Sequence, residues 1–235
     1  MKRFSIVFII SLFFVNLTFS QGDNYKGNST QETKDRLKKF AYSLYTIESY
    51  KERESKIKGS RYIPKNWTTG NIQLKNLENM TLQMKFNTVQ ERFEIKTTEF
   101  IYAIYAPQKI ESIKFQGNSY VLKELDTDEG KKKIFVEELV SGKCCVYKRL
   151  KGTVLQPSYN SSLSVGSKSP KIYLEDYYYF DIKGKTPEEV KPKRRRVWKT
   201  LSDKKSEMKT YIKDNNLHTT NEEDLIQAIN YYNKL

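Results

Sequence analysis

Few residues of this chain have the types and spacing that catalysis or metal binding requires. The sequence contains one histidine, His218, and two adjacent cysteines, Cys144 and Cys145. Hydrolytic triads and most metal sites draw on histidine, and a catalytic thiol needs a base beside it. A glycine-rich phosphate loop, a serine elbow, a Cys-x-x-Cys motif and a His-x-x-x-His motif are all missing from the sequence. We therefore predict a protein that is not an enzyme and has no metal or cofactor.

The two cysteines lie in a segment with the pattern of a strand. Neighbouring side chains on a strand point to opposite faces, so a disulfide between Cys144 and Cys145 would need a distorted backbone. We expect one thiol to be buried as a small apolar group and the other to be weakly exposed.

Acidic residues occur as pairs and as one short cluster. On a strand the side chains of Glu137-Glu138 diverge, and on a helix Glu222-Glu223 belong to the cap, so an acid pair would have to be assembled by folding. The segment Asp126-Thr-Asp-Glu-Gly130 has too few acids for an EF-hand loop, whose ligands span about twelve positions. We expect it to be a solvated turn between strands.

The densest positive cluster is Lys191-Pro-Lys-Arg-Arg-Arg196, in a chain whose formal charge is +14. A cluster of this kind binds phosphate, lipopolysaccharide or other acidic polymers through its charge. The candidate contact residues are Lys191, Lys193, Arg194, Arg195 and Arg196. The alternative is a solvated linker that leads into a helix, which Pro192 and the following Val197-Trp198 favour.

Residues 1–20 have the three parts of a secretory signal peptide. Lys2-Arg3 precede an apolar run from Phe4 to Phe19, and cleavage is expected after Ser20. The run is shorter than the ~20 apolar residues that a spanning helix needs, and no later segment has that length and composition. We expect an exported protein, in the periplasm, at the outer membrane or outside the cell. Loss of the two charges of Lys2-Arg3 leaves +12 of the original +14.

The segment 59–196 has the pattern of an antiparallel β domain. Met80 to Phe86 alternates apolar and polar residues, and Lys133 to Tyr147 contains two strand-like runs that meet at a tight turn, Ser141-Gly142. Phe100 to Tyr105 is continuously apolar, which predicts a strand buried on both faces. The regular spacing predicts a meander in which consecutive strands pair.

The last part of this segment begins with residues 152–170, which are rich in Ser, Gly and Pro and predict a long loop. The strand-like run that follows contains the aromatic residues Tyr177 to Phe180. These are either a stacking platform for bases or sugars or part of a strand that buries alternate rings. Strand propensity favours the second interpretation.

Helical patterns flank the β segment on both sides. Residues 21–58 comprise a polar segment and then an amphipathic helix, whose apolar face contains Leu37, Phe40, Ala41, Leu44 and Ile47. Residues 197–235 predict a pair of helices, the second beginning with a capping box at Thr220-Asn-Glu-Glu223. The fold class that we predict is α+β: a mainly antiparallel, curved sheet with one N-terminal helix and a C-terminal helix pair.

Several short motifs resemble those of a family of uncharacterised secreted proteins common in Bacteroidota. The matching segments are Gly59-Ser-Arg-Tyr-Ile63, Gly70-Asn-Ile72, Leu82-Gln-Met-Lys-Phe-Asn87, Phe93-Glu-Ile95, Leu139-Val-Ser-Gly142 and Tyr231-Tyr-Asn233. The chain departs from the family pattern at Arg61, where proline is usual, and at Gln83-Met-Lys85. The resemblance implies a sheet with terminal helices and a location in the cell envelope, and it implies no activity or functional residues.

Two functions are compatible with these observations. The first is a secreted or periplasmic, non-catalytic module with an interaction or structural role in the envelope, whose partner is an unknown protein or envelope component. The alternative is a basic protein that binds a polyanion such as nucleic acid, lipopolysaccharide or an acidic polymer. The two differ in their response to salt, because polyanion binding weakens steeply as salt rises whereas an interface with an apolar centre does not.

Overall fold

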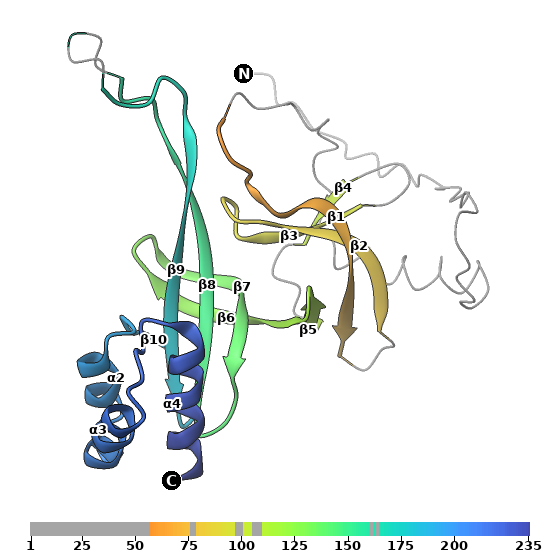
Figure 1. The fold of residues 1–235 in the computed structure, drawn as a ribbon. Helices are drawn as coiled ribbons and strands as arrows, with labels where there is room; N and C mark the ends of the chain where they lie inside the picture. Colours follow the sequence, from red (N-terminus) through yellow and green to blue (C-terminus); the bar gives the residue numbers. More distant parts are fainter. Residues whose placement is uncertain (1–56, 76–78, 97–100, 105–109, 160–161, 163–164) are drawn as a thin grey trace, which may run out of the picture.

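The computed structural model describes residues 57–75, 79–96, 101–104, 110–159, 162 and 165–235. Within these ranges the chain forms one ten-stranded antiparallel sheet followed by a group of helices at its C-terminal end (Figure 1). The mainly antiparallel sheet that the sequence predicts is confirmed.

The sheet is a meander with one exception. Its strand order is β10-β9-β8-β7-β6-β5-β1-β2-β3-β4, so every pair of consecutive strands is adjacent except β4 and β5. The first strand pairs with both β2 and β5 and separates the two parts of the meander. The strands are β1 (Tyr62–Leu74), β2 (Met80–Asn87), β3 (Arg92–Lys96), β4 (Ile101–Ala103), β5 (Ile110–Phe115), β6 (Asn118–Thr127), β7 (Gly130–Val140), β8 (Cys144–Leu155), β9 (Lys171–Ile182) and β10 (Glu188–Glu189).

The strand predicted in the apolar run Phe100 to Tyr105 lies at the edge of the sheet. The apolar run around Ile101–Ala103 forms β4, which pairs only with β3 among the described strands. Ala103 and Ile104 are nevertheless buried. Because these two residues are consecutive, their burial agrees with the prediction of a strand buried on both faces, although the apolar run did not indicate that the strand lies at the edge of the sheet. Residues 100 and 105 of the predicted run lie outside the described residues.

The hairpin predicted at Ser141-Gly142 is confirmed by strands β7 and β8. Three residues, 141–143, connect the strands, and Gly142 has a φ of +150°. A Cβ atom at this glycine would lie 2.6 Å from Asn233 Nδ2. Backbone conformation and close packing therefore both favour glycine at this turn.

The sheet curves until the turn between β2 and β3 meets β8. The amide of Gly152 donates a hydrogen bond to the carbonyl oxygen of Thr88 (2.8 Å), and the amide of Thr88 donates to that of Arg61 (2.8 Å). A Cβ atom at Gly152 would clash with the Thr88 hydroxyl at 2.4 Å. The absence of a side chain at residue 152 thus allows the first strands of the sheet to contact a strand near its other edge.

The C-terminal end forms three α-helices and a short 3-10 helix. They are α2 (Arg194–Thr200), η1 (Ser202–Lys204), α3 (Lys205–Asp214) and α4 (Glu222–Lys234). The predicted pair corresponds to α3 and α4, and α2 is an additional helix that begins inside the basic cluster. Asn221, and not Thr220, is the N-cap of α4, since its side chain accepts a hydrogen bond from the amide of Asp224 (3.2 Å).

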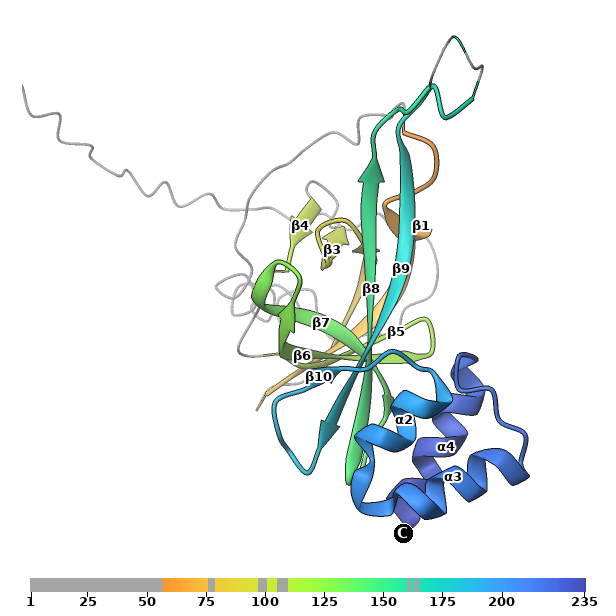
Figure 2. The same ribbon diagram turned by 90° about the vertical axis from the view of Figure 1, so that its left-hand side faces the viewer.

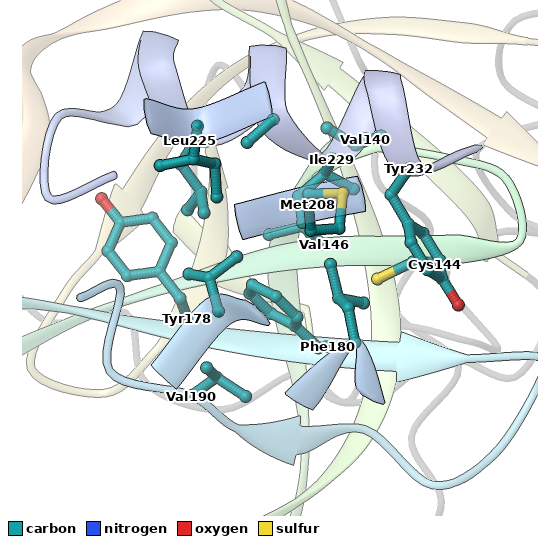
Figure 3. Close-up of a cluster of buried hydrophobic side chains, with 14 of the residues drawn as sticks. Val140, Cys144, Val146, Tyr178, Phe180, Val190, Met208, Leu225, Ile229 and Tyr232 are labelled. Atoms are coloured by element: carbon teal, nitrogen blue, oxygen red, sulfur yellow. The ribbon is translucent and has the colours of Figure 1, made fainter. Parts of the chain in front are cut away.

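These helices pack against one face of the sheet around β8 and β9. The cluster between them joins side chains of β7, β8 and β9 to side chains of α3 and α4 (Figure 3). Its fully buried members include Val146, Phe180, Met208, Ile229 and Tyr232. A second apolar cluster fills the sheet between β1, β2, β3 and β5, and a third lies around Tyr147 and Tyr179.

The signal peptide at residues 1–20 and most of the helix expected within residues 21–58 lie outside the described residues. The last residues of that helix are an exception. Lys58 forms a parallel bridge with Lys171 and is therefore extended, so a helix that continues to Lys58 was a wrong prediction. Within the described ranges, no helix has the length and hydropathy to span a bilayer.

Candidate interaction surfaces

The most prominent feature of the molecule is a long hairpin formed by β8 and β9. Twelve register pairs join the two strands, from Cys144↔Ile182 to Leu155↔Lys171. The half nearer Cys144 is covered by the helices, and the other half projects beyond the rest of the sheet (Figures 1 and 2). We call the described residues of this other half, 152–159, 162 and 165–174, the arm.

Large apolar side chains are exposed on the arm. Six large hydrophobic residues are exposed among the described ones, and all but Leu235 belong to the arm: Leu155, Tyr159, Val165, Tyr173 and Leu174. Their exposed fractions run from 38% for Leu155 to 56% for Val165. The prediction of one long loop over residues 152–170 was wrong at its start, because β8 continues to Leu155. The aromatic pattern of Lys171–Ile182 predicted burial, and no periodicity in the sequence marked where that burial ends.

The base of the arm is tied to the remainder of the protein. Lys58 and β9 exchange backbone hydrogen bonds, in which the Lys58 amide donates to Pro170 (2.9 Å) and the Ile172 amide donates to Lys58 (3.0 Å). On the other strand, Gly152 donates to Thr88. Both edges of the hairpin are therefore fixed where the arm leaves the sheet.

The side chains of the basic cluster, residues 191–196, differ in their exposure. Lys191, Lys193, Arg195 and Arg196 are exposed, but the Arg194 side chain turns inward and its Nε donates to the carbonyl oxygen of Leu217 (2.5 Å). Arg194 thereby joins the start of α2 to the connection between α3 and α4. The structure thus separates one structural arginine from four residues that remain candidates for polyanion contact.

A second row of positive charge was missed by the sequence reasoning. Lys205, Lys209 and Lys213 recur every four residues along α3 and are all exposed, while Met208 and Ile212 on the same helix are buried. The row therefore lies on the outer side of α3, with about 6 Å of helix rise between neighbours. The four-residue spacing was the signal available in the sequence.

Folding also assembles the acid pair that was left open above. One member of each pair, Glu137 of β7 and Glu222 of α4, contacts Lys148 of β8, at 3.0 Å and 2.9 Å. The hydroxyl of Tyr178 donates to the same Glu222 carboxylate (3.1 Å). This cluster connects the first turn of α4 to two strands.

The electrostatics of this cluster follow from partial burial. Burial raises the pKa of Glu137, and its hydrogen bond to Lys148 opposes the shift without cancelling it. For Lys148, burial lowers the pKa, but the hydrogen bonds to Glu222 and Glu137 outweigh that effect and shift it upward. Lys148 thus remains a cation whose ionic contacts are internal to the fold.

The cysteines occupy the environments expected for them. Both thiols are free; Cys144 is buried and Cys145 is half-buried. Burial raises the pKa of Cys144 to about 12. A thiol with that pKa remains protonated and is a poor nucleophile at neutral pH.

The other candidates also have structural roles. In the acidic segment 126–130, Asp128 and Glu129 form the turn between β6 and β7 and pair with Lys151. In the aromatic run, Tyr178, Tyr179 and Phe180 are buried, on both faces of the sheet and not only on alternate positions. His218 is exposed between α3 and α4, and within the described ranges no three His, Cys, Asp or Glu side chains lie close enough to hold a metal ion.

A shallow depression lies between α3 and α4. Its volume is about 380 Å³, and Tyr211 and Tyr231 stack in its wall with their ring centroids 3.8 Å apart and their planes at 1°. Each ring covers one face of the other. The wall of the depression therefore contains two stacked tyrosine rings, each with one face already covered, beside the side-chain amides of Gln227 and Asn230.

Comparison with known proteins adds no relative to this description. No family model matches the chain. No significant match was found among curated proteins or among solved structures.

Proposed function

We propose that this protein is an exported, non-catalytic interaction module of the cell envelope that contacts its partner through the arm. The observation that carries the proposal is the concentration of exposed apolar side chains on one projecting element, Leu155, Tyr159, Val165, Tyr173 and Leu174. Full burial of a large apolar side chain contributes roughly 1.5–3 kcal/mol, and each of these residues leaves part of that free energy unrealised. Exposed apolar residues gathered on one element are typical of a surface that is covered by a partner.

The non-catalytic part of the proposal is supported by the ion pairs and the hydrogen bond within the cluster of Glu137, Lys148, Glu222 and Tyr178. Lys148 is bound on both sides by carboxylates of the same chain, and Tyr178 is bound to one of them. Groups that are paired in this way hold elements together and present no free acid or base to a substrate. No member of this cluster lines the depression between α3 and α4.

Membership of the secreted Bacteroidota family is also a proposal, and two of its motifs meet in the fold. Asn233 of the Tyr-Tyr-Asn segment accepts a hydrogen bond from the Cys144 amide (2.7 Å) and donates to the Cys144 carbonyl oxygen (3.0 Å). Its amide group also occupies the space above Gly142 of the hairpin motif. This contact supports a structural role for both motifs.

The second candidate function is polyanion binding through α2 and α3. Residues 191–213 contain ten basic and two acidic residues, which is a large part of the total charge of +14. The exposed row of Lys205, Lys209 and Lys213 favours this candidate, because a row of cations along one helix face is suited to an extended anion. Arg195 and Lys199, four residues apart on α2, are also exposed.

The proposed function is tested by photo-crosslinking in cells that export the protein. A photoreactive amino acid at Tyr173 is expected to yield discrete adducts, whereas the same group at Leu235, which is exposed to a similar degree but lies off the arm, is not. Adducts from position 235 alone would refute the arm as the contact surface. N-terminal sequencing of the recovered protein should begin at Gln21, and a chain that begins at Met1 would refute export with cleavage.

A further inference from the structure

Strand β9 contains the longest run of exposed residues in the described sheet. Tyr173, Leu174, Glu175 and Asp176 are all exposed, whereas no other described strand has more than two exposed residues in a row. Neighbouring side chains on a strand point to opposite faces of the sheet. Both faces of β9 are therefore accessible along this run, which lies at the base of the arm.

The outer edge of β9 has backbone partners before and after this run. Its inner edge pairs with β8 throughout. On the outer edge, the Ile172 amide donates to the Lys58 carbonyl oxygen (3.0 Å), and the Tyr178 carbonyl oxygen accepts from the Val190 amide (2.8 Å). We call the outer edge between these two bonds, along residues 173–177, the open edge. It is long enough for an extended segment of about five residues, since a strand rises about 3.3 Å per residue.

Two residues direct free backbone groups to the open edge. The N–H and C=O groups of a strand alternate between its two edges, and those of Ile172 and Tyr178 lie on the outer one. Leu174 and Asp176 therefore face the outer edge as well. Within the residues that the structure describes, the N–H and C=O groups of these two residues have no hydrogen-bond partner. Such a row of unpaired groups is a template for pairing with another strand.

The open edge is acidic although the chain as a whole is strongly basic. In the described part of the chain neither Glu175 nor Asp176 forms an ion pair, and Glu175 accepts a hydrogen bond from the Tyr177 hydroxyl (3.1 Å). Glu188 and Glu189 belong to β10, which continues the same edge, and both are also exposed. These carboxylates attract a cationic partner to the outer edge of β9.

A second copy of the chain is a poor match for the open edge. When two β9 strands pair antiparallel with Leu174 opposite Asp176, Glu175 lies opposite the same residue of the other copy, and like charges in that position are destabilising. A register centred on either free residue places the other one opposite Ile172 or Tyr178, whose outer groups are already bonded. The open edge therefore fits a strand with a different sequence.

From these observations we infer that an extended basic segment of a protein partner adds to β9 as an antiparallel strand along residues 173–177. The inference rests on the proposed function and specifies the partner that contacts the base of the arm. The backbone groups of Leu174 and Asp176 pair with the added strand, and basic side chains lie opposite Glu175 and Asp176. Apolar side chains lie opposite Tyr173 and Leu174. The orientation is antiparallel, as it is for β10 on the same edge.

The experiment is an NMR titration of the full mature chain with a capped pentapeptide, Thr-Lys-Lys-Val-Val. In the antiparallel register its lysines lie opposite Asp176 and Glu175, and its valines lie opposite Leu174 and Tyr173. We expect saturable binding that slows the hydrogen exchange of the Leu174 and Asp176 amides. The matched peptide Thr-Glu-Glu-Val-Val should bind about tenfold more weakly, because attractive cross-strand pairs become repulsive.

Methylation of the peptide backbone separates strand addition from charge attraction. An N-methyl group on the first valine, opposite Leu174, removes an N–H that pairs with β9 and should lower the affinity by about tenfold or more. An N-methyl group on the second lysine, opposite Glu175, is the matched control, because the N–H at that position points away from β9. Equal affinities of these two methylated peptides would show that the peptide does not add as a strand.

The same distinction is made on the protein. Leu174→Pro removes an outward amide without breaking the pairing with β8, so binding should fall by about tenfold or more, whereas Leu174→Ala keeps that amide and should lose less. Glu175→Lys/Asp176→Lys should lower the affinity to a similar extent. Glu207→Lys/Asp214→Lys gives the same change of net charge at exposed residues of α3 and should bind as the wild type does. Should Leu174→Pro not fold, the two charge variants decide.

The outcomes for this inference and for the proposed function are distinct. Absence of pentapeptide binding, or wild-type binding by Glu175→Lys/Asp176→Lys, would overturn the inference. Protein adducts from a photoreactive group at Tyr173 that persist in that charge variant would leave the proposed function standing, with a partner that does not add a strand. Absence of adducts from Tyr173 would remove the proposed function, and with it the natural partner that the inference assigns to the open edge.

Discussion

Arg149 and Glu91 form a buried ion pair that holds the turn between β2 and β3 against β8. The guanidinium group donates from Nε to Oε1 (2.5 Å) and from its Nη2 atom to Oε2 (2.9 Å), and the two side chains are only 1% and 7% exposed. Glu91 has a φ of +52°, a conformation that is uncommon for a residue other than glycine. The ion pair thus joins residues 58 positions apart in a part of the sheet where no strand pairing connects them.

Breaking this pair is expected to destabilise the fold strongly. Arg149→Gln leaves the Glu91 carboxylate buried without its partner, so the free energy of unfolding should fall by about 3–5 kcal/mol. The matched control is Lys133→Gln, which breaks an exposed pair with Glu124 and should change stability by less than ~0.5 kcal/mol. Urea denaturation measures both. Wild-type stability of Arg149→Gln would contradict this role for the pair.

Gly142 and Asn233 are expected to be energetically coupled. Asn233→Ala removes hydrogen bonds to the Cys144 amide and carbonyl, which should cost about 1–3 kcal/mol. Gly142→Ala should cost more in the wild type than in the Asn233→Ala background, because its Cβ meets the Asn233 side chain. A double-mutant cycle should give a coupling of about 0.5–3 kcal/mol.

The control for that cycle is Gly130→Ala. Gly130 also has a positive φ, +92°, but nothing lies within 4 Å of where a Cβ atom would stand at this residue. The substitution therefore adds backbone strain without a clash, and its cost should be the same in the wild type and in the Asn233→Ala background. Additive effects at Gly142 and Asn233 would show that the close approach has no energetic consequence.

Glu137 is expected to make stability depend on pH in a specific direction. Because burial raises its pKa in the folded state, the folded protein binds this proton more tightly than the unfolded chain does. Its contribution to stability is present below the unfolded pKa and is lost as pH rises through the folded pKa. The stability of Glu137→Gln relative to the wild type should therefore increase from about pH 4 to pH 7. Glu124→Gln, at an exposed carboxylate, is the control, and an identical pH profile for Glu137→Gln and the wild type would contradict the sign of the shift.

The arginines of the basic cluster are expected to separate by their effect on stability. Arg194→Gln removes the hydrogen bond to the Leu217 carbonyl oxygen and should lower the free energy of unfolding by about 1–3 kcal/mol. Arg195→Gln/Arg196→Gln should change it by less than ~0.5 kcal/mol, since both side chains are exposed. Thermal or urea unfolding measures the stability of both variants. Equal changes in the free energy of unfolding would contradict the structural role of Arg194, which would then again be a candidate polyanion contact.

The two thiols are expected to differ in reactivity. In the folded protein a thiol reagent should modify Cys145 and leave Cys144 unmodified, because Cys144 is fully buried and burial raises its pKa to about 12. Mass spectrometry should show one adduct on the native protein and two after denaturation. The Cys145→Ser variant, which should show no native adduct, is the control. Rapid modification of Cys144 in the native state would show that the helices do not cover β8 as described.

Patterns with a short period were predictable from the sequence. The hairpin at Ser141-Gly142 and the strand predicted from the alternation of Met80 to Phe86 follow from local rules about turns and pleated strands, and both occur in the structure. The predicted polar face of that strand is exposed at Thr81 and Gln83 but buried at Lys85. That one cysteine is buried and the other partly exposed follows from the same alternation, whereas the structure alone shows that the buried one is Cys144. The apolar stripe of α4 identified that helix, although its cap lies one residue later than expected.

Long-range contacts were not predictable in the same way. Nothing in the local pattern of Tyr62–Leu74 indicates that this strand lies between β2 and β5, because any strand with an apolar face satisfies the same period. The meeting of Glu137, Lys148 and Glu222 depends on the placement of α4 on the sheet. Sequence neighbours such as Glu137-Glu138 point apart, whereas distant carboxylates converge.

The sequence by itself determined the antiparallel strands, the C-terminal helices and the strongly basic charge of +14, because each depends on residue type and near-neighbour spacing. The tertiary structure alone decided which apolar residues remain exposed. Tyr173 and Tyr179 have the same type and lie on the same strand, yet Tyr173 is 49% exposed on the arm and Tyr179 is fully buried. The difference arises because the layers that cover β8 and β9 extend over only one half of the hairpin, and the position where that covering ends is a property of the folded chain.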